Sequence, residues 1–261
     1  MRDSENILKS LALAGVEWEL DEPGSKSAPP ESAVRAGKST NARAAAAAEA
    51  PRFSAPIAAK PLSNAAVLEI ARRLAAADDI FGAIESFREH PLFSGAKNTV
   101  PPQIPNGAPG GQCEVPLLVV ADIPSLADDA CGRILSGAEG ELFDKMISAV
   151  GFSRGDIAIT PLVFWRPAGG RAPGADELAF CRPFVGRIVA MTRPKKILTL
   201  GALAAMEIAG ASLPRDHGKV KGSIVDSPKS MDVIPIYKPD FILANPAVKK
   251  DVWEALKGLV S

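Results

Sequence analysis

Cysteine is scarce in this chain, and its placement excludes two kinds of architecture. Cys113, Cys131 and Cys181 are odd in number and include no Cys-x-x-Cys pair. This spacing argues against a disulfide framework and against a self-contained thiolate metal site. The N-terminus carries Asp3 and Glu5 and has no continuous apolar core, so it lacks the pattern of a signal peptide. We expect a cytoplasmic protein.

The chain also lacks the common motifs for nucleotides and for activated serines. No Gly-x-Gly-x-x-Gly or Walker-type loop is present, which leaves a nucleotide cofactor without support. Gly-x-Ser-x-Gly is absent, and a Ser-His-Asp triad would have to use His217, which lies in a charged segment. No run approaches the roughly 18 apolar residues of a membrane span, so no membrane contact is expected.

The chain also has no net excess of positive or negative charge. The formal net charge is zero, so no global field draws the chain to nucleic acid or to membranes. The balance is uneven, because residues 185–261 hold more lysine and arginine than aspartate and glutamate. That excess indicates either a solvated surface or a surface that faces DNA.

Composition divides the chain into three parts. Residues 1–20 predict a short amphipathic helix with Ser4 as its N-cap. Residues 21–60 are rich in proline, alanine and serine, and they cannot bury enough apolar surface to offset their ordering entropy, which predicts a disordered linker. Residues 61–261 have the composition of a folded domain. The tethered helix could dock on this domain or on a protein partner.

Within the domain, short apolar runs alternate with helical patterns. The runs cover residues 115–121, 157–164, 196–201 and 233–237, with helices expected between them. Short continuous apolar strands that alternate with helices are typical of an α/β fold whose parallel sheet is covered on both faces. In such a sheet, ligands bind at the carboxyl ends of the strands.

Lys238 lies at that end of the fourth run, between Tyr237 and Pro239. Lysine is rarely buried without a partner, so a solvated loop lysine is one interpretation. A site-facing cation is the other, because a flexible charge at a strand carboxyl end is well placed to meet a ligand.

Four segments follow one another along the chain. They begin with "LLVVADIPS" and continue with "DDACGRILSGAEGELFDKMISAVGFSRGDIAIT", "WRPAGGRAPGADELAFCRPFVGRIVAMTRPKKILTLGALAA" and "IPIYKPDFILANPAVKKDVWEAL". In their order and spacing these segments resemble the bacterial family 4-type uracil-DNA glycosylases. The resemblance covers roughly residues 77–256. It implies a three-layer α/β/α sandwich with a central four-stranded parallel sheet. It also implies a DNA repair hydrolase that extrudes a base from DNA and cleaves its N-glycosidic bond. We also expect the protein to be a monomer.

The family's Gly-Glu-Ala-Pro-Gly loop, which activates water, falls on residues 121–125. Its carboxylate corresponds to Asp122, which is either catalytic or a capping aspartate, and Ile123 and Pro124 would line the pocket. The phenylalanine that stacks on the base corresponds to Leu135. Leucine offers no aromatic face, so stacking worth roughly 1–3 kcal/mol is weakened.

The resemblance assigns two further pocket positions to changed residues. The asparagine that reads the edge of uracil corresponds to Pro161, which has no amide to offer. The histidine that stabilises the departing base corresponds to Lys238, which follows Tyr237 at the pocket. Lys238 could oppose the charge of the leaving group, act as a Schiff-base nucleophile, or hold a phosphate or nothing in an inactivated pocket. The losses at Leu135 and Pro161 favour the third interpretation.

The family's four cluster-binding cysteines correspond to His90, Phe93, Trp165 and Cys181. One thiolate cannot hold a four-iron cluster, so we expect no iron–sulfur cluster, no metal and no other cofactor. Trp165 has the bulk to fill the vacated space, and Cys181 is expected to be an ordinary buried thiol.

The family's loop near DNA falls around His217, with Arg215, Lys219 and Lys221 as a basic flank suited to phosphates. The leading hypothesis is a divergent glycosylase-like protein that binds DNA, with weak, altered or lost base excision. The alternative is a non-catalytic scaffold that recruits partners through its N-terminal helix and linker.

Overall fold

The computed structural model describes most of the expected domain, namely residues 62–105, 113–218, 220–223 and 230–260. The helix expected within residues 1–20 and the linker expected over 21–60 lie outside the described residues, and both stay expectations. In the part of the chain that is described, no helix is both long and apolar enough to cross a membrane.

Four parallel strands form the centre of the sheet, as predicted. Their order across the sheet is β2-β1-β3-β5. A fifth strand, β4, pairs antiparallel with β5 at the edge, and the sequence did not predict it because it is short and polar. The strands are β1 (Leu117–Ala121), β2 (Ala158–Pro161), β3 (Lys196–Leu200), β4 (Val220–Ser223) and β5 (Ser230–Ile236).

Alternate residues of each central strand enter two separate cores. On β1, Leu118 and Val120 join one cluster, whereas Leu117, Val119 and Ala121 join the other. Both faces of the strand are therefore buried, which is why its sequence is continuously apolar rather than alternating. The resulting three-layer sandwich is the predicted fold class.

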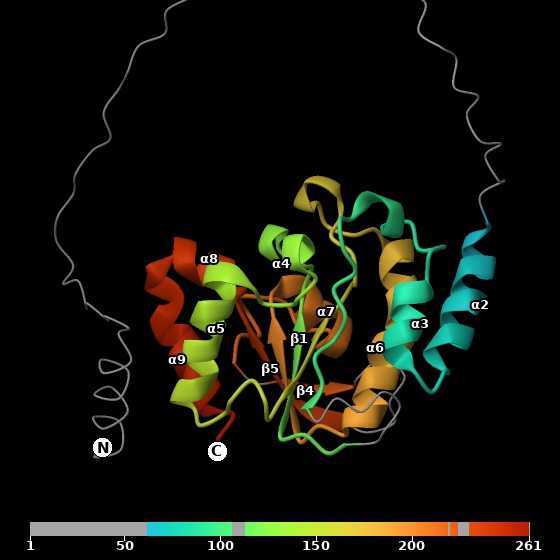
Figure 1. Ribbon diagram of the computed structural model, residues 1–261. Helices are drawn as coiled ribbons and strands as arrows, with labels where there is room; N and C mark the ends of the chain where they lie inside the picture. Colours follow the sequence, from blue (N-terminus) through green and yellow to red (C-terminus); the bar gives the residue numbers. More distant parts are fainter. Residues whose placement is uncertain (1–61, 106–112, 219, 224–229, 261) are drawn as a thin grey trace, which may run out of the picture.

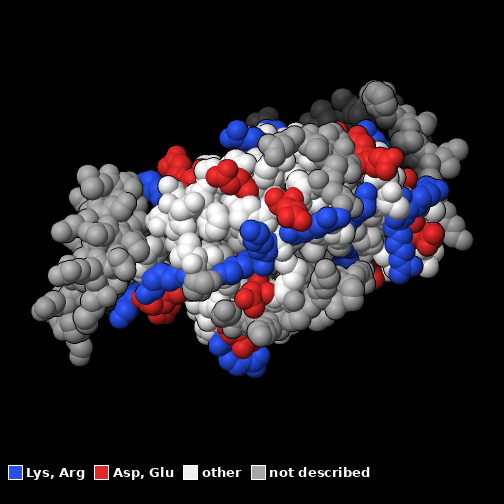
Figure 2. Space-filling model, turned by 90° about the horizontal axis from the view of Figure 1, so that it is seen from below, with Lys and Arg blue, Asp and Glu red and all other residues white. Residues whose placement is uncertain are grey.

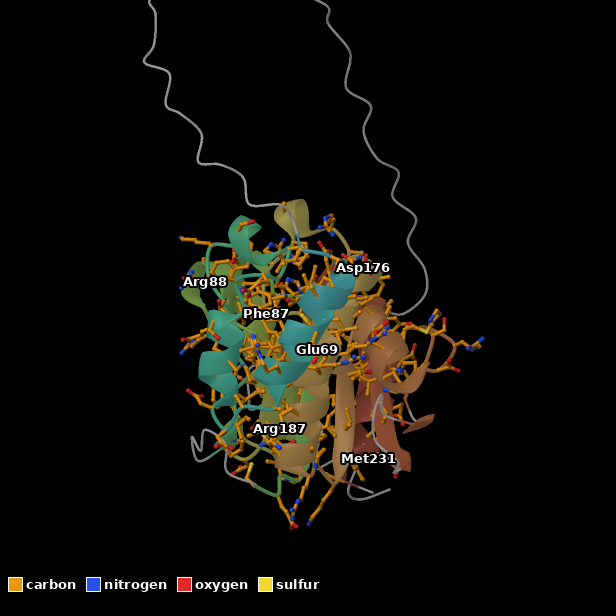
Figure 3. The ribbon with its side chains drawn as sticks, turned by 90° about the vertical axis from the view of Figure 1, so that its right-hand side faces the viewer. Glu69, Phe87, Arg88, Asp176, Arg187 and Met231 are labelled. Carbon is orange, nitrogen blue, oxygen red and sulfur yellow. The ribbon has the colours of Figure 1, made fainter. Side chains whose placement is uncertain are left out.

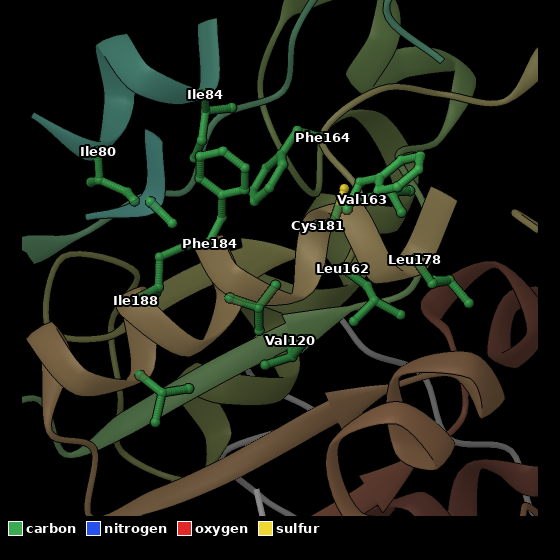
Figure 4. Packing of buried hydrophobic residues seen from close by; sticks show 14 of the residues in the cluster. Ile80, Ile84, Val120, Leu162, Val163, Phe164, Leu178, Cys181, Phe184 and Ile188 are labelled. Carbon is green, nitrogen blue, oxygen red and sulfur yellow. The ribbon is translucent and has the colours of Figure 1, made fainter. Parts of the chain in front are cut away.

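One helical layer covers the first face of the sheet. Its helices are α2 (Asn64–Ala75), α3 (Ile80–Ser86), α6 (Ala175–Thr192) and α7 (Ala202–Ala209). The N-caps Ser63 of α2 and Asp79 of α3 both accept backbone N–H groups of the helices that they begin. Figure 3 shows α2 lying against α6, and Asn64 donates a hydrogen bond to Asp176 across this contact at 2.7 Å. Figure 4 shows how Phe184 of α6 packs with Phe164 and Ile84 in this core.

A second layer covers the other face. It consists of α5 (Gly137–Ala149), α8 (Pro239–Ala244) and α9 (Lys249–Lys257), and α5 packs against α8. Short elements complete the domain: α4 (Leu126–Cys131) and the single turns η1 (Phe93–Gly95), η3 (Ala168–Gly170) and η4 (Pro246–Val248). The helices predicted between the apolar runs correspond to α5, α6 and α7, whereas α4 and α8 were not predicted.

The carboxyl ends of the parallel strands meet at the upper edge in Figure 1, where α4 and α8 also lie. The opposite face, seen from below in Figure 2, shows lysine and arginine interleaved with aspartate and glutamate on the described residues. The visible part of that face has no large area of one charge, so it offers DNA phosphates no continuous basic surface.

Candidate functional site

Asp122 follows the carboxyl end of β1 and caps a helix. Its Oδ1 accepts the N–H of Ala204 at 2.6 Å, and its Oδ2 accepts the N–H of Leu203 at 3.4 Å, both in the first turn of α7. Gly201, which precedes α7 with a φ of 111°, leaves the space that the carboxylate occupies, because a Cβ there would overlap it. Burial raises the pKa of Asp122 to about 6, although the two N–H groups and the charge of Lys238 oppose the rise.

The residues around Asp122 are buried or half-buried. Pro124 is buried, and its carbonyl accepts a hydrogen bond from Arg166 at 2.6 Å, while Ile123 is half-buried. Leu135 is also buried and has a φ of 52°, an uncommon conformation for a residue with a side chain. Its carbonyl lies where a side chain at Gly140 would project, so glycine is required at that position.

Pro161 is the last residue of β2 and pairs with Ala121 of β1. It is buried, and only its carbonyl can hydrogen-bond. At this position the site therefore presents no amide side chain and no backbone donor to a ligand.

Lys238 is the N-cap residue of α8 at the carboxyl end of β5. Its side chain is only 22% exposed, and its Nζ lies 3.1 Å from Oδ2 of Asp240. The charge of Lys238 also acts on the carboxyl groups of Asp122 and Glu139. Lys238 is thus a partly buried, ion-paired residue and not a freely solvated loop lysine.

Tyr237, the residue before Lys238, stands between two other rings. Its ring centroid lies 4.8 Å from that of His217 and 5.0 Å from that of Phe241, and both pairs are tilted by 31°. Tyr237 therefore contacts two rings, of which that of Phe241 belongs to a residue that is 44% exposed.

Sequence reasoning missed two charged residues of this edge. Arg166 follows β2 in the segment "WRPAGG", and Glu139 lies in the first turn of α5. Burial raises the pKa of Glu139, and the charges of Lys238 and Arg166 oppose that rise. No motif marks Glu139, because only the packing of α5 on α8 brings it toward Lys238.

The four positions that the resemblance equates with cluster ligands lie together in the fold. The ring of Trp165 stacks on that of His90 with a centroid distance of 4.6 Å, and Phe93 meets Trp165 edge-on at 6.2 Å. The Nε2 of His90 lies 3.3 Å from the Sγ of Cys181. Aromatic rings thus occupy the space between these positions.

These residues do not suit an iron–sulfur cluster. His90 accepts the N–H of Leu92 through Nδ1, and its Nε2 lies 3.1 Å from the carbonyl of Glu177, so both ring nitrogens are engaged. Burial lowers the pKa of His90 to about 4 and raises that of Cys181 to about 12, which keeps a neutral imidazole and a protonated thiol. Among the described residues, no three histidine, cysteine, aspartate or glutamate side chains are grouped to hold a metal ion.

The segment expected to face DNA is described only in part. Arg215 is exposed but pairs with Asp216 at 3.0 Å. His217 lines a cavity of about 490 Å³ whose wall also includes Asp251 and Glu254. Lys219 lies outside the described residues, and Lys221 belongs to β4 with a side chain that is not described.

Comparison with known proteins identifies the family to which the chain belongs. The model of the uracil DNA glycosylase superfamily matches residues 109–257, more than half of the chain. The type-4 uracil-DNA glycosylase of Pyrobaculum aerophilum is 29% identical over 172 residues, which cover 64% of this chain and 84% of that protein. The type-4 enzyme of Archaeoglobus fulgidus is 29% identical over 180 residues, covering 67% and 86%.

A third type-4 uracil-DNA glycosylase, from Sulfurisphaera tokodaii, is 32% identical over 162 residues, covering 58% of this chain and 72% of that protein. The matched region contains all four parallel strands and the residues that meet at their carboxyl ends. The chain belongs to the uracil-DNA glycosylase superfamily, and its resemblance within that superfamily is to the type-4 enzymes.

Proposed function

We propose that this chain binds DNA at the carboxyl edge of its sheet and excises uracil weakly or acts on an altered base. The observation that carries the proposal is that Pro161 ends β2 and Lys238 follows β5 at the same carboxyl edge of a superfamily fold, with Leu135 buried just before α5. Each of these positions corresponds to a pocket residue in the resemblance, and each holds a different residue type here. The scaffold is kept while the chemistry that reads uracil is changed.

Recognition of the base should suffer first. Pro161 is buried at the end of β2 and offers only a carbonyl, so it cannot pair with both a donor and an acceptor on the edge of uracil. A site that leaves a base unread neither holds it firmly nor selects it. Leu135 can pack against a base but adds no aromatic stacking.

For Lys238, the surroundings favour the role of a cation opposed to the charge of a departing base. An ammonium that is paired with Asp240 is not a free amine, which argues against a Schiff-base nucleophile. A phosphate would place a permanent negative charge near the carboxylates of Asp122 and Glu139, whereas a departing base is charged only as its bond breaks, which argues against a phosphate site. A pre-organised cation can still stabilise an anionic leaving group.

Two measurements on the full-length protein test the proposal. Fluorescence anisotropy with single- and double-stranded oligonucleotides measures binding, and alkaline cleavage of labelled DNA measures base release over a panel of damaged bases. We expect binding at low salt, and uracil release at least about a thousand-fold slower than by a type-4 relative assayed in parallel. Absence of binding at low salt would contradict the proposal and favour the scaffold alternative.

A further inference from the structure

We propose that Glu139 is a catalytic carboxylate of this chain, which takes a proton from the water that attacks the sugar of an extruded nucleotide. This inference rests on the proposed function and adds to it the residue that activates water. In the resemblance that role falls to Asp122. The geometry of the strand-end loop gives Asp122 another task.

Glu139 lies near residues that the resemblance places in the pocket. It stands in the first turn of α5, and α5 packs against α8, the helix that Lys238 caps. The next residue, Gly140, fits closely against the carbonyl of Leu135, which corresponds to a wall of the base pocket. The side chain of Glu139 is half-buried, so it is shielded from bulk solvent but still open to a water molecule.

The other carboxylates of this edge are already engaged. Asp122 accepts two N–H groups of α7. Asp128 accepts backbone N–H groups at 2.9 and 2.7 Å, one through each oxygen. Asp240 pairs with Lys238 at 3.1 Å and accepts the N–H of the following residue. Glu139 alone of these four makes no hydrogen bond or ion pair with any described residue, which leaves its oxygens available for water.

The charges that face Glu139 suit a general base. Lys238 and Arg166 favour its ionised form, whereas Asp240 and Asp128 disfavour it. Burial is the largest influence and raises the pKa of Glu139 above its ordinary value. A carboxylate with a raised pKa is a stronger base than an exposed one and is still ionised once the pH exceeds that pKa.

The proposed step balances without a co-reactant. The water oxygen bonds to the anomeric carbon of the deoxyribose while the Glu139 carboxylate accepts the water proton. The bond from that carbon to the base nitrogen breaks, and its electron pair leaves with the base. The ammonium of Lys238 opposes the negative charge that develops on the base, which later gains a proton from solvent.

The test compares Glu139→Gln with a matched control on the same helix, Glu141→Gln, which is exposed. Single-turnover base release is measured with enzyme in excess, on whichever base of the panel the unmodified protein releases fastest. We expect Glu139→Gln to slow release at least about a hundred-fold, as for loss of a general base, and Glu141→Gln to stay within about two-fold. The unmodified rate should fall as the pH drops through the raised pKa of Glu139, and the residual rate of Glu139→Gln should not.

Equal rates for Glu139→Gln and Glu141→Gln would overturn the inference, as would a failure of the unmodified protein to release any base. Neither result would remove the proposed DNA binding, which the anisotropy measurement reports separately. Circular dichroism and thermal unfolding of both variants establish that a lost rate is not a lost fold.

Discussion

The Nε2 atom of His90 lies 3.3 Å from the Sγ of Cys181, and Trp165 covers the imidazole with a stacked indole. Two residues that are 91 positions apart in the sequence thus share a buried site, where the type-4 resemblance calls for cysteine ligands. The indole also donates a hydrogen bond from Nε1 to Thr99 at 3.0 Å. This arrangement stabilises the domain through packing and hydrogen bonds between neutral groups.

His90 should make the protein sensitive to acid. Its pKa is about 4 in the folded state against 6.5 for the unperturbed side chain, so the folded state binds fewer protons than the unfolded state between these values. The stability that neutral His90 provides is complete above pH 6.5 and is lost as the pH falls toward 4, by about 3 kcal/mol. Urea unfolding between pH 7.5 and 4.5 gives the free energy of unfolding of the unmodified protein and of His90→Phe. In acid the unmodified protein should lose more of this free energy than the variant does. Parallel curves would contradict this.

The purified protein should be colourless. Three of the four ligand positions hold no cysteine, and the aromatic rings of Trp165 and Phe93 occupy the site. We expect no broad absorption near 400 nm and no stoichiometric iron, even after expression with added iron, when absorption spectroscopy is combined with elemental analysis. A type-4 relative purified in parallel is the control. Iron with acid-labile sulfide in this chain would refute the prediction.

Gly201→Ala should destabilise the fold by more than about 2 kcal/mol. A Cβ at this position would meet the Asp122 carboxylate, and a φ of 111° is strained for alanine. Gly210→Ala is a matched control, because Gly210 ends the same helix with a φ of 62° and has nothing within 4 Å of an added Cβ. Gly210→Ala should lower the free energy of unfolding by only about 1–2 kcal/mol. Equal losses in chemical denaturation would mean that Asp122 moves aside freely.

DNA affinity should fall steeply with added salt, because each phosphate contact releases counterions. Lys219→Gln together with Lys221→Gln should weaken binding and flatten the salt dependence without changing sequence preference. Arg215→Gln should have a smaller effect, since Asp216 already pairs with Arg215. Anisotropy titrations from 25 to 200 mM salt measure both quantities. Salt-insensitive binding would count against phosphate contacts by this segment.

Uracil release should not be restored by Lys238→His alone. The imidazole would regain the family's donor for the leaving group, but Pro161 would still leave the base unread. The double change Lys238→His with Pro161→Asn should release uracil faster than either single change, and single-turnover rates of all four proteins form the comparison. Robust uracil release by the unmodified protein, abolished by Lys238→Ala, would instead make the lysine a working group for uracil.

The sheet could be predicted because its central strands are buried on both faces and stand out as apolar runs. β4 could not be predicted, because the strand has only four residues, most of them not apolar, and pairs only with β5. α4 was also missed, although Ser125 and Asp128 form a capping box that marks its start. α8 begins with Pro239, and proline at the first position is a signal of a helix start. The apolar run before Pro239 predicted a strand, and the proline signal was not used.

Residues of the candidate site that directly follow a strand could be located from the sequence, whereas contacts that depend on tertiary packing could not. Lys238 was located because parallel strands place their carboxyl ends together. The capping of α7 by Asp122 depends on β1 and β3 being neighbours, which no local pattern reports. Glu139 depends on the rotation of α5 against α8, and a polar residue in a first helical turn gives no sign of what it faces.

Tyr237 is the only tyrosine in the chain, and its ring lies between those of His217 and Phe241 directly before Lys238. Biosynthetic fluorotyrosine would therefore give a single fluorine resonance from the edge of the candidate site. A nucleotide that displaced either neighbouring ring would shift that resonance, because the ring currents of both neighbours act on the fluorine. The molecule thus carries its own spectroscopic reporter, readable without assigning any other signal.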